Sequence, residues 1–308
     1  MRTHDVVEEA AAALGGRARR HVPLGPLTTY RVGGPAALFF EINDEADVEA
    51  ARRAVSSTGV AVLVVGKGSN LLVSDAGFSG MAIALGGRFG AIDEQPEARV
   101  RAGGAVSLPV LARRTAGAGL TGLEWSVGVP GSVGGGVRMN AGGHGSEMSS
   151  CVSRYWLADL TGGEDGELPA SRLDYGYRRS SVLAHQVVLA AEFQLRAGPR
   201  SESEATIAEI VRWRRENQPG GQNAGSVFTN PSGASAGQLI EAAGLKGHRR
   251  GSAYVSPKHA NFFQADDGGS ADDVRRLIEE VRQRVHEETG VDLVPELRLV
   301  GFAGRDAG

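Results

Sequence analysis

The sequence of 308 residues predicts a mixed α/β fold, and two features of its patterning support that prediction. Short runs of β-branched and apolar residues, such as 60–66, alternate with segments whose apolar residues recur at helical spacing, such as 270–290. Hydrophobic residues make up 41% of the chain and charged residues 22%, a composition typical of folded globular proteins. A chain of this length is sufficient for two or three compact units.

A first unit over residues 1–86 has the pattern of a β-α-β arrangement. Its expected elements are a helix over 5–14, strands over 37–42, 60–66 and 80–85, and a helix that takes Asn43 as its N-cap. Val48, Ala51 and Val55 follow Asn43 at helical spacing, so they are expected on the buried face of that helix.

A second unit over residues 87–200 is predicted because a new pattern of strands, a helix and a glycine-rich tract begins there. The expected elements are strands over 98–105, 152–160 and 185–195, and a helix that begins at Ser107 with Pro109 in its first turn. Between them lies the tract 117–145, which is unusually rich in glycine.

A third unit over residues 201–308 is predicted to be an α/β domain. A helix over 203–217 is expected to bury Ile207, Ile210, Val211 and Trp213. A capping box of Ser235 and Gln238 predicts a second helix that stops at Gly244. The strongest helix pattern runs from Ser270, as N-cap, to Gly290. A strand is expected over 293–301, and it is the one element of this unit that could pack against the first two units.

Composition and charge exclude several classes of protein. The formal net charge of −3 gives no basic field for nucleic acid, and no apolar run reaches the ~20 residues of a membrane span. The N-terminal segment is acidic where a signal peptide needs an apolar core. A single cysteine, Cys151, rules out an internal disulfide and a multi-thiolate metal site. A cytoplasmic protein without a metal or an obligate protein partner is therefore expected.

Two glycine-rich segments are candidates for binding phosphate groups. In 64–77, a strand is followed by the run GKGSN, where freed backbone N–H groups and two polar side chains form a nest that suits a diphosphate. A plain turn explains this run equally well, because it is neither a Walker motif nor G-x-G-x-x-G. The segment 122–147 offers a second glycine cradle, and its His144 is interpreted as a polar surface residue.

Three further segments carry reactive side chains. Residues 173–182 contain two adjacent arginines, and arginine binds carboxylates through two parallel hydrogen bonds. Residues 223–231 contain Ser226 between small neighbours, and Glu296 lies in the otherwise apolar segment 294–301. Each segment also has an ordinary structural explanation: an exposed strand, a turn and a solvent-facing carboxylate, respectively. The order of two glycine cradles, an arginine, a serine and a carboxylate is the more informative observation.

Together these segments resemble the UDP-N-acetylenolpyruvoylglucosamine reductases, the MurB family of flavoenzymes in peptidoglycan synthesis. The likeness covers nearly the whole chain, and its pieces appear in the family's order: PLTTYRVGGPA, GKGSNLLVSDAGFSG, GVPGSVGGGVRMNAG, YGYRRS, AGSVFTNP, AGLKG, SPKHANFF and PELRLVG. The resemblance implies two subdomains that hold FAD in the vanillyl-alcohol-oxidase (PCMH) type of fold, followed by a substrate-binding domain. The short spacing between Asn230 and Lys246 matches the family's shorter type, which lacks an extra tyrosine-bearing loop.

The resemblance also implies an activity and a set of site residues. The family uses NADPH and non-covalent FAD to reduce the enolpyruvyl ether of a UDP-sugar to a lactyl ether. The family's catalytic arginine, acid serine and carboxylate fall on Arg178, Ser226 and Glu296. Substrate-contacting positions fall on Tyr177, Asn230 and Lys246. The FAD positions fall on Gly66, Lys67, Gly68, Ser69, Asn70, Leu71, Gly128, Gly131, Ser132, Gly135, Asn140, Ala141 and Gly142.

The sequence departs from the family pattern at two places and leaves two alternatives open. Asn217 stands where the family often has a lysine, and NAGGHGSE replaces the usual NAGAYGGE. One alternative is a flavin-dependent oxidase of the same fold, although the run GKGSN lacks the histidine that many such oxidases link to flavin. The other is a nucleotide-binding relative without catalysis, against which the joint presence of Arg178, Ser226 and Glu296 argues.

Overall fold

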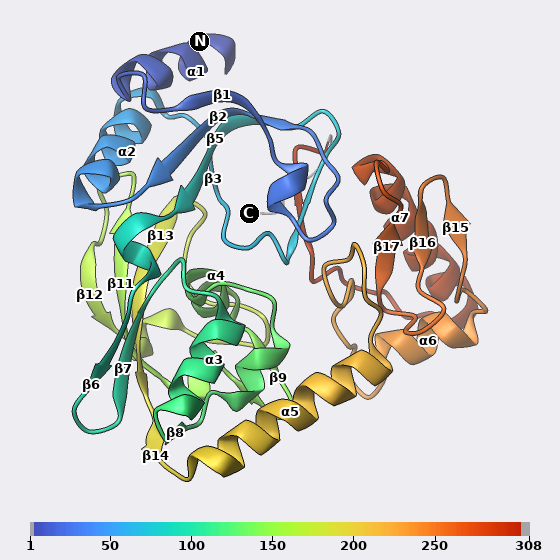
Figure 1. Cartoon of the computed structure of the whole chain (residues 1–308). Helices are drawn as coiled ribbons and strands as arrows, with labels where there is room; N and C mark the ends of the chain where they lie inside the picture. Colours follow the sequence, from blue (N-terminus) through green and yellow to red (C-terminus); the bar gives the residue numbers. More distant parts are fainter. Residues whose placement is uncertain (1–2, 303–308) are drawn as a thin grey trace.

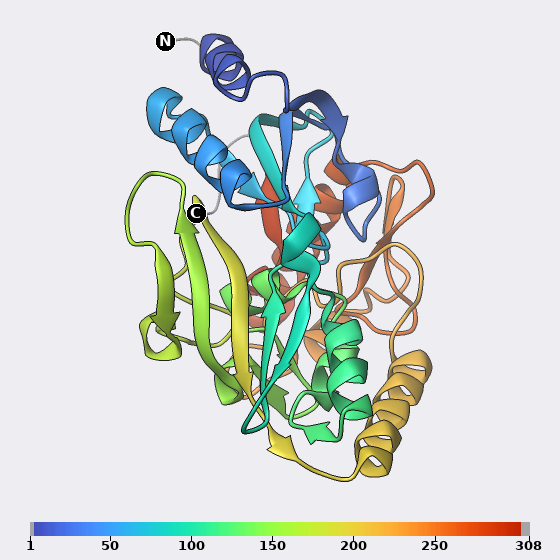
Figure 2. The same ribbon diagram turned by 60° about the vertical axis from the view of Figure 1, so that its left-hand side comes forward.

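The computed structural model describes residues 3–302, and its elements form three groups around a central junction (Figure 1). The first group contains a mixed four-stranded sheet of order β1-β2-β5-β3. Its elements are α1 (Thr3–Ala13), β1 (Arg19–Pro23), β2 (Pro35–Ile42), α2 (Glu45–Thr58), β3 (Val62–Val64) and β5 (Phe78–Leu85). Strands β2, β5 and β3 run parallel, because α2 carries the chain from β2 across to β3. Helices α1 and α2 lie together beside this sheet (Figure 2).

The predicted burial of Val48, Ala51 and Val55 on α2 is confirmed, but the predicted N-cap is one residue too early. Asp44, not Asn43, caps α2, because the Asp44 carboxylate accepts a hydrogen bond from the backbone N–H of Asp47 at 3.0 Å.

The second group contains an antiparallel sheet of order β12-β11-β13-β7-β6. Its elements are β6 (Ile92–Gln95), β7 (Arg99–Gly103), α3 (Leu108–Gly117), α4 (Val133–Met139), β11 (Val152–Asp159), β12 (Gly166–Pro169) and β13 (Gln186–Gln194). Two short pairs complete it: β8 (Leu120–Thr121) with β14 (Arg196–Ala197), and β9 (Gly142–Gly143) with β10 (Ser146–Glu147). Helix α4 packs on β13. Ser132, just before α4, lies against Gly66, which follows β3 of the first sheet.

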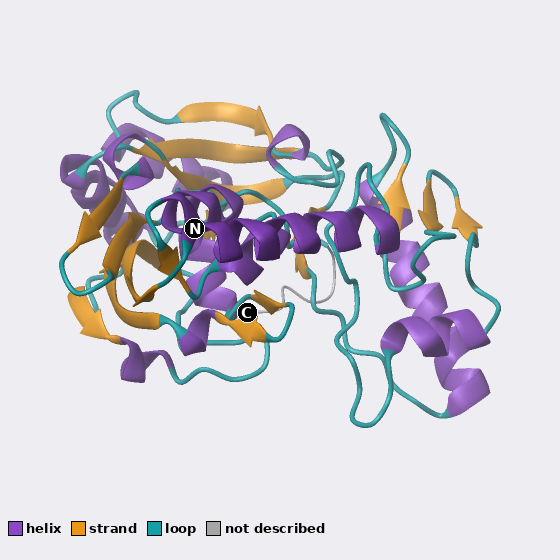
Figure 3. Ribbon diagram, turned by 60° about the horizontal axis from the view of Figure 1, so that its bottom comes forward, coloured by secondary structure: helices purple, strands orange, loops and turns teal. Residues whose placement is uncertain are grey.

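The third group is joined to the second by the long helix α5 (Arg200–Asn217), which crosses between them in Figure 3. The group consists of α6 (Ala236–Ala242), β15 (Arg249–Arg250), β16 (Ala253–Val255), β17 (Phe263–Ala265) and α7 (Ala271–Thr289). The prediction for α7 is confirmed at both ends, since Ser270 caps it and Gly290 ends it with φ +71°.

Two other predictions for the third group are wrong. Val211 and Trp213 of α5 are 42% and 45% exposed, because α5 packs along a narrow stripe that contains Ser203, Ile207 and Ile210. The Ser235 side chain makes no capping hydrogen bond. The backbone N–H of Ala236 donates instead to the side-chain oxygen of Asn230, at 3.0 Å.

The end of the chain returns to the first group. Strand β18 (Arg298–Val300) pairs in parallel with β4 (Leu71–Val73), which directly follows the first glycine segment. The strand is shorter than the sequence pattern predicts, so Glu296 lies in the segment before it. The core of the third group also includes Tyr30, Val32 and Leu72 from the first group. The division of the chain at residues 86 and 200 stays a prediction.

None of the helices within residues 3–302 combines the length and apolar character that a membrane crossing requires.

Candidate active site

An open cavity lies where segments from all three groups meet. Its empty volume, which includes space open to solvent, is about 1310 Å³. Most of the residues expected in the site line it: Gly66, Lys67, Gly68, Ser69, Asn70, Leu71, Gly128, Gly131, Ser132, Gly135, Ala141, Gly142, Arg178, Ser226 and Glu296. The structure therefore gathers side chains that lie far apart in the sequence into one space.

The two glycine segments approach each other closely along one wall. A Cβ atom on Gly66 would collide with the hydroxyl of Ser132 in the second segment. Gly68 has φ +61°, and a side chain there would collide with the backbone of Leu27 and Thr28. Ser132 caps α4 by accepting a hydrogen bond from the backbone N–H of Gly135 at 3.3 Å. These contacts require glycine at residues 66 and 68 and leave the backbone of both segments open to a ligand.

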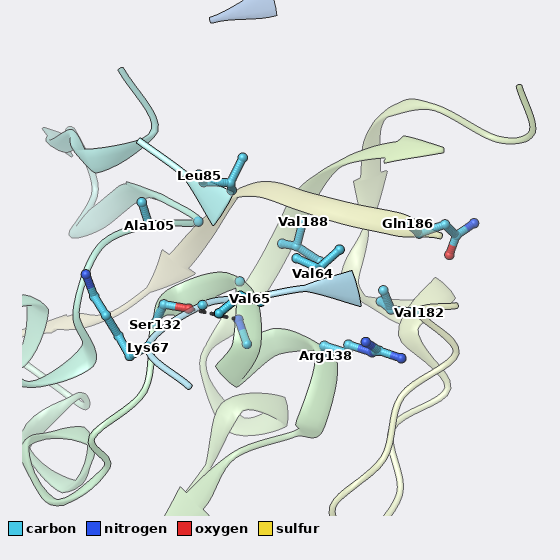
Figure 4. A pocket seen from close by; sticks show the side chains of 14 residues that line it. Val64, Val65, Lys67, Leu85, Ala105, Ser132, Arg138, Val182, Gln186 and Val188 are labelled. Atoms are coloured by element: carbon cyan, nitrogen blue, oxygen red, sulfur yellow. Dashed lines mark hydrogen bonds between the residues drawn. The ribbon is translucent and has the colours of Figure 1, made fainter. Parts of the chain in front are cut away.

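A narrower side cavity of about 560 Å³ extends from this wall between the first and second groups. Aliphatic side chains such as Val64 and Val188 line it, and Lys67, Ser132 and Arg138 line both cavities. Figure 4 shows Arg138 near Val182 and Lys67 toward the opposite end of the side cavity. A polar junction between an apolar pocket and a larger open cavity fits a long ligand with a charged middle, such as a dinucleotide.

Arg178 occupies a strained position in a tight turn. Gly176 and Arg179 exchange two backbone hydrogen bonds, of 3.1 and 3.2 Å, around the central residues Tyr177 and Arg178. Arg178 has φ +56°, a conformation that favours glycine or asparagine at this place in a turn. Such strain typically costs about 1–3 kcal/mol and persists where surrounding contacts hold the residue in place.

Those contacts come from the Arg178 guanidinium. Its Nε lies 2.9 Å from Oε1 of Glu296, and its Nη2 donates to the carbonyl oxygen of Gly142 at 3.0 Å. The side chains of Arg178 and Glu296 are 21% and 19% exposed, so the ion pair is largely shielded from solvent while both groups still face the cavity.

Ser226 is held by a buried asparagine that the sequence analysis did not single out. Asn261, 3% exposed, accepts a hydrogen bond from the backbone N–H of Phe228 through its side-chain oxygen and donates to the Phe228 carbonyl. Its own carbonyl accepts from the N–H of Val227 at 2.9 Å. Within the described residues, the Ser226 hydroxyl has no hydrogen-bond partner, so it is available to a ligand in the cavity.

The Glu296 segment connects the serine loop to the first glycine segment. The backbone N–H of Glu296 donates to the Val227 carbonyl at 2.8 Å, and its carbonyl accepts from the Asn70 side chain at 3.2 Å. Burial raises the pKa of the Glu296 carboxyl, and the charge and hydrogen bond of Arg178 offset part of that rise. A carboxyl group in this setting can hold a proton more readily than one in water.

Four of the expected site residues do not line the cavity. Asn140 is buried at the end of α4, where it accepts from the N–H of Ser149 and donates to the Gly176 carbonyl, so it joins the second glycine segment to the arginine turn. Tyr177 is 57% exposed, with its ring 5.0 Å from the guanidinium carbon of Arg178. Asn230 caps the start of α6, and Lys246 pairs with Glu241 at 2.6 Å.

Three arginines line the cavity without having been singled out: Arg138, Arg214 and Arg298. Burial lowers the pKa of Arg214, whose Nε donates to Gln218 at 2.7 Å. All three lie within or beside segments that the sequence analysis quoted, but nothing in the spacing of arginines distinguishes a buried one from an exposed one.

The two departures from the family pattern lie near α5. Asn217 donates to the Trp213 carbonyl and is exposed, and the ring of His144 packs edge-on against Trp213 with centroids 5.2 Å apart. Burial and the nearby charge of Arg214 lower the pKa of His144, which favours its neutral form.

Comparison with known proteins agrees with this geometry. Residues 36–163 match the FAD binding domain family, and residues 217–300 match the family described as UDP-N-acetylenolpyruvoylglucosamine reductase, C-terminal domain. The reductase of Heliobacterium modesticaldum is 41% identical over 94% of this chain and 92% of its own, and that of Paramagnetospirillum magneticum is 43% identical over 95% and 94%. The crystal structure of the reductase (MurB) from Thermus caldophilus superposes with a TM-score of 0.80 and 35% identity, over 92% of this chain and 99% of its own. The chain belongs to the UDP-N-acetylenolpyruvoylglucosamine reductase family of flavoenzymes.

Proposed function

We propose that this protein reduces UDP-N-acetylglucosamine enolpyruvate to UDP-N-acetylmuramate with NADPH, as a step in the synthesis of peptidoglycan precursors. The observation that carries the proposal is the convergence of Arg178, Ser226 and Glu296 on a cavity that both glycine segments also line. A nucleotide-binding relative without catalysis would have no need of a strained arginine paired with a buried carboxylate.

The two glycine segments are proposed to hold FAD without a covalent bond. Gly66, Gly68 and Ser69 on one side, and Ser132 and Gly135 on the other, would hold the diphosphate. When bound, FAD supplies hydride transfer, from NADPH and then to the methylene carbon of the enolpyruvyl group. Lys67, Asn70, Leu71, Gly128, Gly131, Asn140, Ala141 and Gly142 complete the proposed FAD set.

Arg178 and Glu296 are proposed to act on the carboxylate of the substrate. Hydride addition to the methylene carbon moves negative charge onto that carboxylate as an enolate forms. Arg178 lies in a partly desolvated position, where a fixed positive charge stabilises developing negative charge more strongly than it does in water. Glu296, whose pKa burial raises, can donate a hydrogen bond to the same group when it is protonated.

Ser226 is proposed to protonate the remaining carbon. A serine is a weak acid in water, but the enolate carbon is strongly basic, and positioning within about 3–3.5 Å allows the transfer. The double bond receives one hydride and one proton, NADPH becomes NADP⁺, and a proton from solvent restores the Ser226 hydroxyl. Tyr177, Asn230 and Lys246 are proposed to contact the UDP-sugar from the rim of the cavity.

The two half-reactions provide the test. Anaerobic addition of NADPH should bleach the flavin absorbance near 450 nm, and the enolpyruvyl substrate should then restore it. The reduced flavin of an oxidase would stay bleached when this substrate is added anaerobically. It would regain its absorbance only when oxygen is admitted. Acid precipitation of the protein should release the flavin into the supernatant, because no covalent link is expected. Replacing NADPH by NADH in the first half-reaction tests which nicotinamide is the reductant.

A further inference from the structure

The turn that carries Arg178 is attached to the end of helix α4 on both sides. Before the central residues of the turn, the carbonyl of Gly176 accepts a hydrogen bond from the Asn140 side chain at 3.0 Å. After them, the hydroxyl of Ser180 donates to the carbonyl of Arg138 at 2.6 Å. Asn140 is the C-cap of α4, and Arg138 lies in its last turn. Both ends of the arginine turn are therefore fixed to one short stretch of α4.

The hydrogen bond from Ser180 satisfies a carbonyl that the helix itself leaves free. The last carbonyls of an α-helix have no partner within the helix, and Arg138 stands directly before the final residue of α4. The backbone N–H of Val182 donates to the same hydroxyl at 3.3 Å, so the Ser180 oxygen accepts one hydrogen bond while it donates another. The hydroxyl is thus held in one orientation, although Ser180 lines neither cavity.

The other end of α4 belongs to the proposed FAD cradle. Its N-cap, Ser132, and Gly135 in its first turn line the main cavity. The helix therefore sets the distance between the cradle and the arginine turn. Arg178 reaches Glu296 from a backbone with φ +56°, a conformation that residues other than glycine rarely adopt. A turn released from α4 could relax to an ordinary conformation, which would displace the guanidinium.

We propose that Ser180 is a positioning residue for the reduction of the substrate, because it attaches the turn of Arg178 to α4 and so holds the guanidinium at a set place relative to the FAD cradle. Its role rests on the functions of FAD and Arg178 described under Proposed function. Ser180 acts in the second half-reaction, where Arg178 stabilises the charge on the substrate carboxylate. It has no part in the first half-reaction, where NADPH reduces the flavin.

Anaerobic stopped-flow absorbance of the FAD-loaded protein tests this role in each half-reaction. Ser180→Ala should slow reoxidation by the substrate about tenfold, because a small displacement of a group at the reacting centre is costly, and should leave reduction by NADPH within about twofold of wild type. Ser180→Thr keeps the hydroxyl and should restore reoxidation to near the wild-type rate. Ser180→Cys, with a weaker donor of similar size, should lie between them. A threonine variant as slow as the alanine variant would count against the hydroxyl as the cause.

The neighbouring serine provides a matched control. The hydroxyl of Ser181 makes the same kind of hydrogen bond, but to the carbonyl of Arg172 at 2.7 Å rather than to α4. Ser181→Ala should therefore leave both half-reactions at the wild-type rate. A loss of reoxidation in Ser181→Ala equal to that in Ser180→Ala would show that attachment to α4 is not the reason, and would overturn the inference.

The same measurement in an Arg178→Gly background shows whether Ser180 acts through Arg178. Residues that act through one interaction have non-additive effects on a rate. Adding Ser180→Ala to Arg178→Gly should therefore slow reoxidation by no more than about twofold. A further loss as large as that seen in the wild-type background would show that Ser180 acts independently of Arg178, and would overturn the inference.

Two other results would also overturn it. One is reoxidation of Ser180→Ala at the wild-type rate. The other is an equal loss in both half-reactions together with a lowered midpoint of urea unfolding, which would make the Ser180 hydroxyl a structural contact only. A wild-type protein whose flavin is not bleached by NADPH, or not restored by the substrate, would refute the proposed function itself. That result is seen before any variant of Ser180 is compared.

Discussion

The carboxylate of Glu296 lies 2.9 Å from the guanidinium of Arg178, although one comes from the segment before β18 and the other from a turn of the second group. The pair joins three parts of the site, because Arg178 also donates to Gly142 in the glycine cradle and Glu296 is bonded to the serine loop. Because both side chains face the cavity, replacing either one should change the rate of the reaction more than the free energy of unfolding. The two residues can be tested separately.

Replacement of Arg178 by glycine should separate activity from stability. Glycine relieves the backbone strain at φ +56°, a gain of about 1 kcal/mol that offsets the lost ion pair. The free energy of unfolding should stay within about 1 kcal/mol of wild type, while substrate reduction falls by about 10²-fold or more. Urea unfolding and stopped-flow absorbance give the two values. Arg179→Gly, at the exposed neighbouring residue, should leave the rate unchanged, and a large loss of rate in that control would contradict the assignment.

Replacement of Ser226 by alanine should affect one half-reaction only. Flavin reduction by NADPH needs no proton from Ser226, whereas completion of the lactyl ether does. A positioned general acid contributes ~10²–10⁴-fold to a rate. Reoxidation of the reduced flavin by the substrate should therefore slow by about 10⁴-fold or more. Ser226→Cys should recover part of the rate, because a thiol can still donate a proton. Ser232→Ala, at an exposed serine nearby, is the control. Near wild-type reoxidation of Ser226→Ala would remove Ser226 from the mechanism.

Replacement of Glu296 by glutamine should change how stability depends on pH. Burial raises the pKa of Glu296 above its ordinary value of 4.5. A carboxyl with a raised pKa stabilises the fold at low pH and loses that contribution as pH rises through its folded-state pKa. The glutamine variant does not titrate, so its free energy of unfolding relative to wild type should increase from about pH 4 to about pH 8. Glu209→Gln, on the exposed face of α5, should show no such trend. If the free energy of unfolding of Glu296→Gln, relative to wild type, fell as pH rises, the pKa of Glu296 would be lowered in the folded protein and this prediction would be wrong.

Replacement of Gly66 by alanine should weaken FAD binding while the fold is retained. The added methyl group collides with the hydroxyl of Ser132, so the two glycine segments must move apart and the cap of α4 is disturbed. Fluorescence titration of the apoprotein should show at least a tenfold weaker affinity, a loss of about 1.4 kcal/mol or more. Gly143→Ala is the matched control, because its methyl group meets no other atom within 4 Å and its φ is ordinary. Equal affinities for the two variants would argue against the proposed cradle.

The sequence predicts long amphipathic elements well, because their own residues determine them. Helix α7 has its cap, its apolar face and its terminal glycine within one segment, and all three are confirmed. Strand β4 was not predicted, since its three residues are too few for a period and its partner β18 lies at the other end of the chain. Burial of Val211 and Trp213 was predicted from their apolar character, but α5 meets its neighbours along one stripe only.

The same distinction applies to the candidate site. Glycine-rich segments and an isolated serine are visible as local patterns, so the sequence drew attention to them. Asn261 lies in the quoted run SPKHANFF, but its role arises from hydrogen bonds to Phe228, which is distant in the sequence. A single sequence carries no local sign of such contacts.

The parallel pairing of β4 with β18 has a consequence for how the protein is made. Arg298 pairs with Leu71, so this contact has to wait until synthesis has passed residue 298. Contacts between residues so distant in sequence also form late in folding, because a long loop must close first. The glycine segments and the arginine turn leave the ribosome well before Glu296, which lies in the segment just before β18. A newly made chain therefore carries an incomplete site until the segment with Glu296 and β18 has emerged, and the cofactor can be enclosed only after that point.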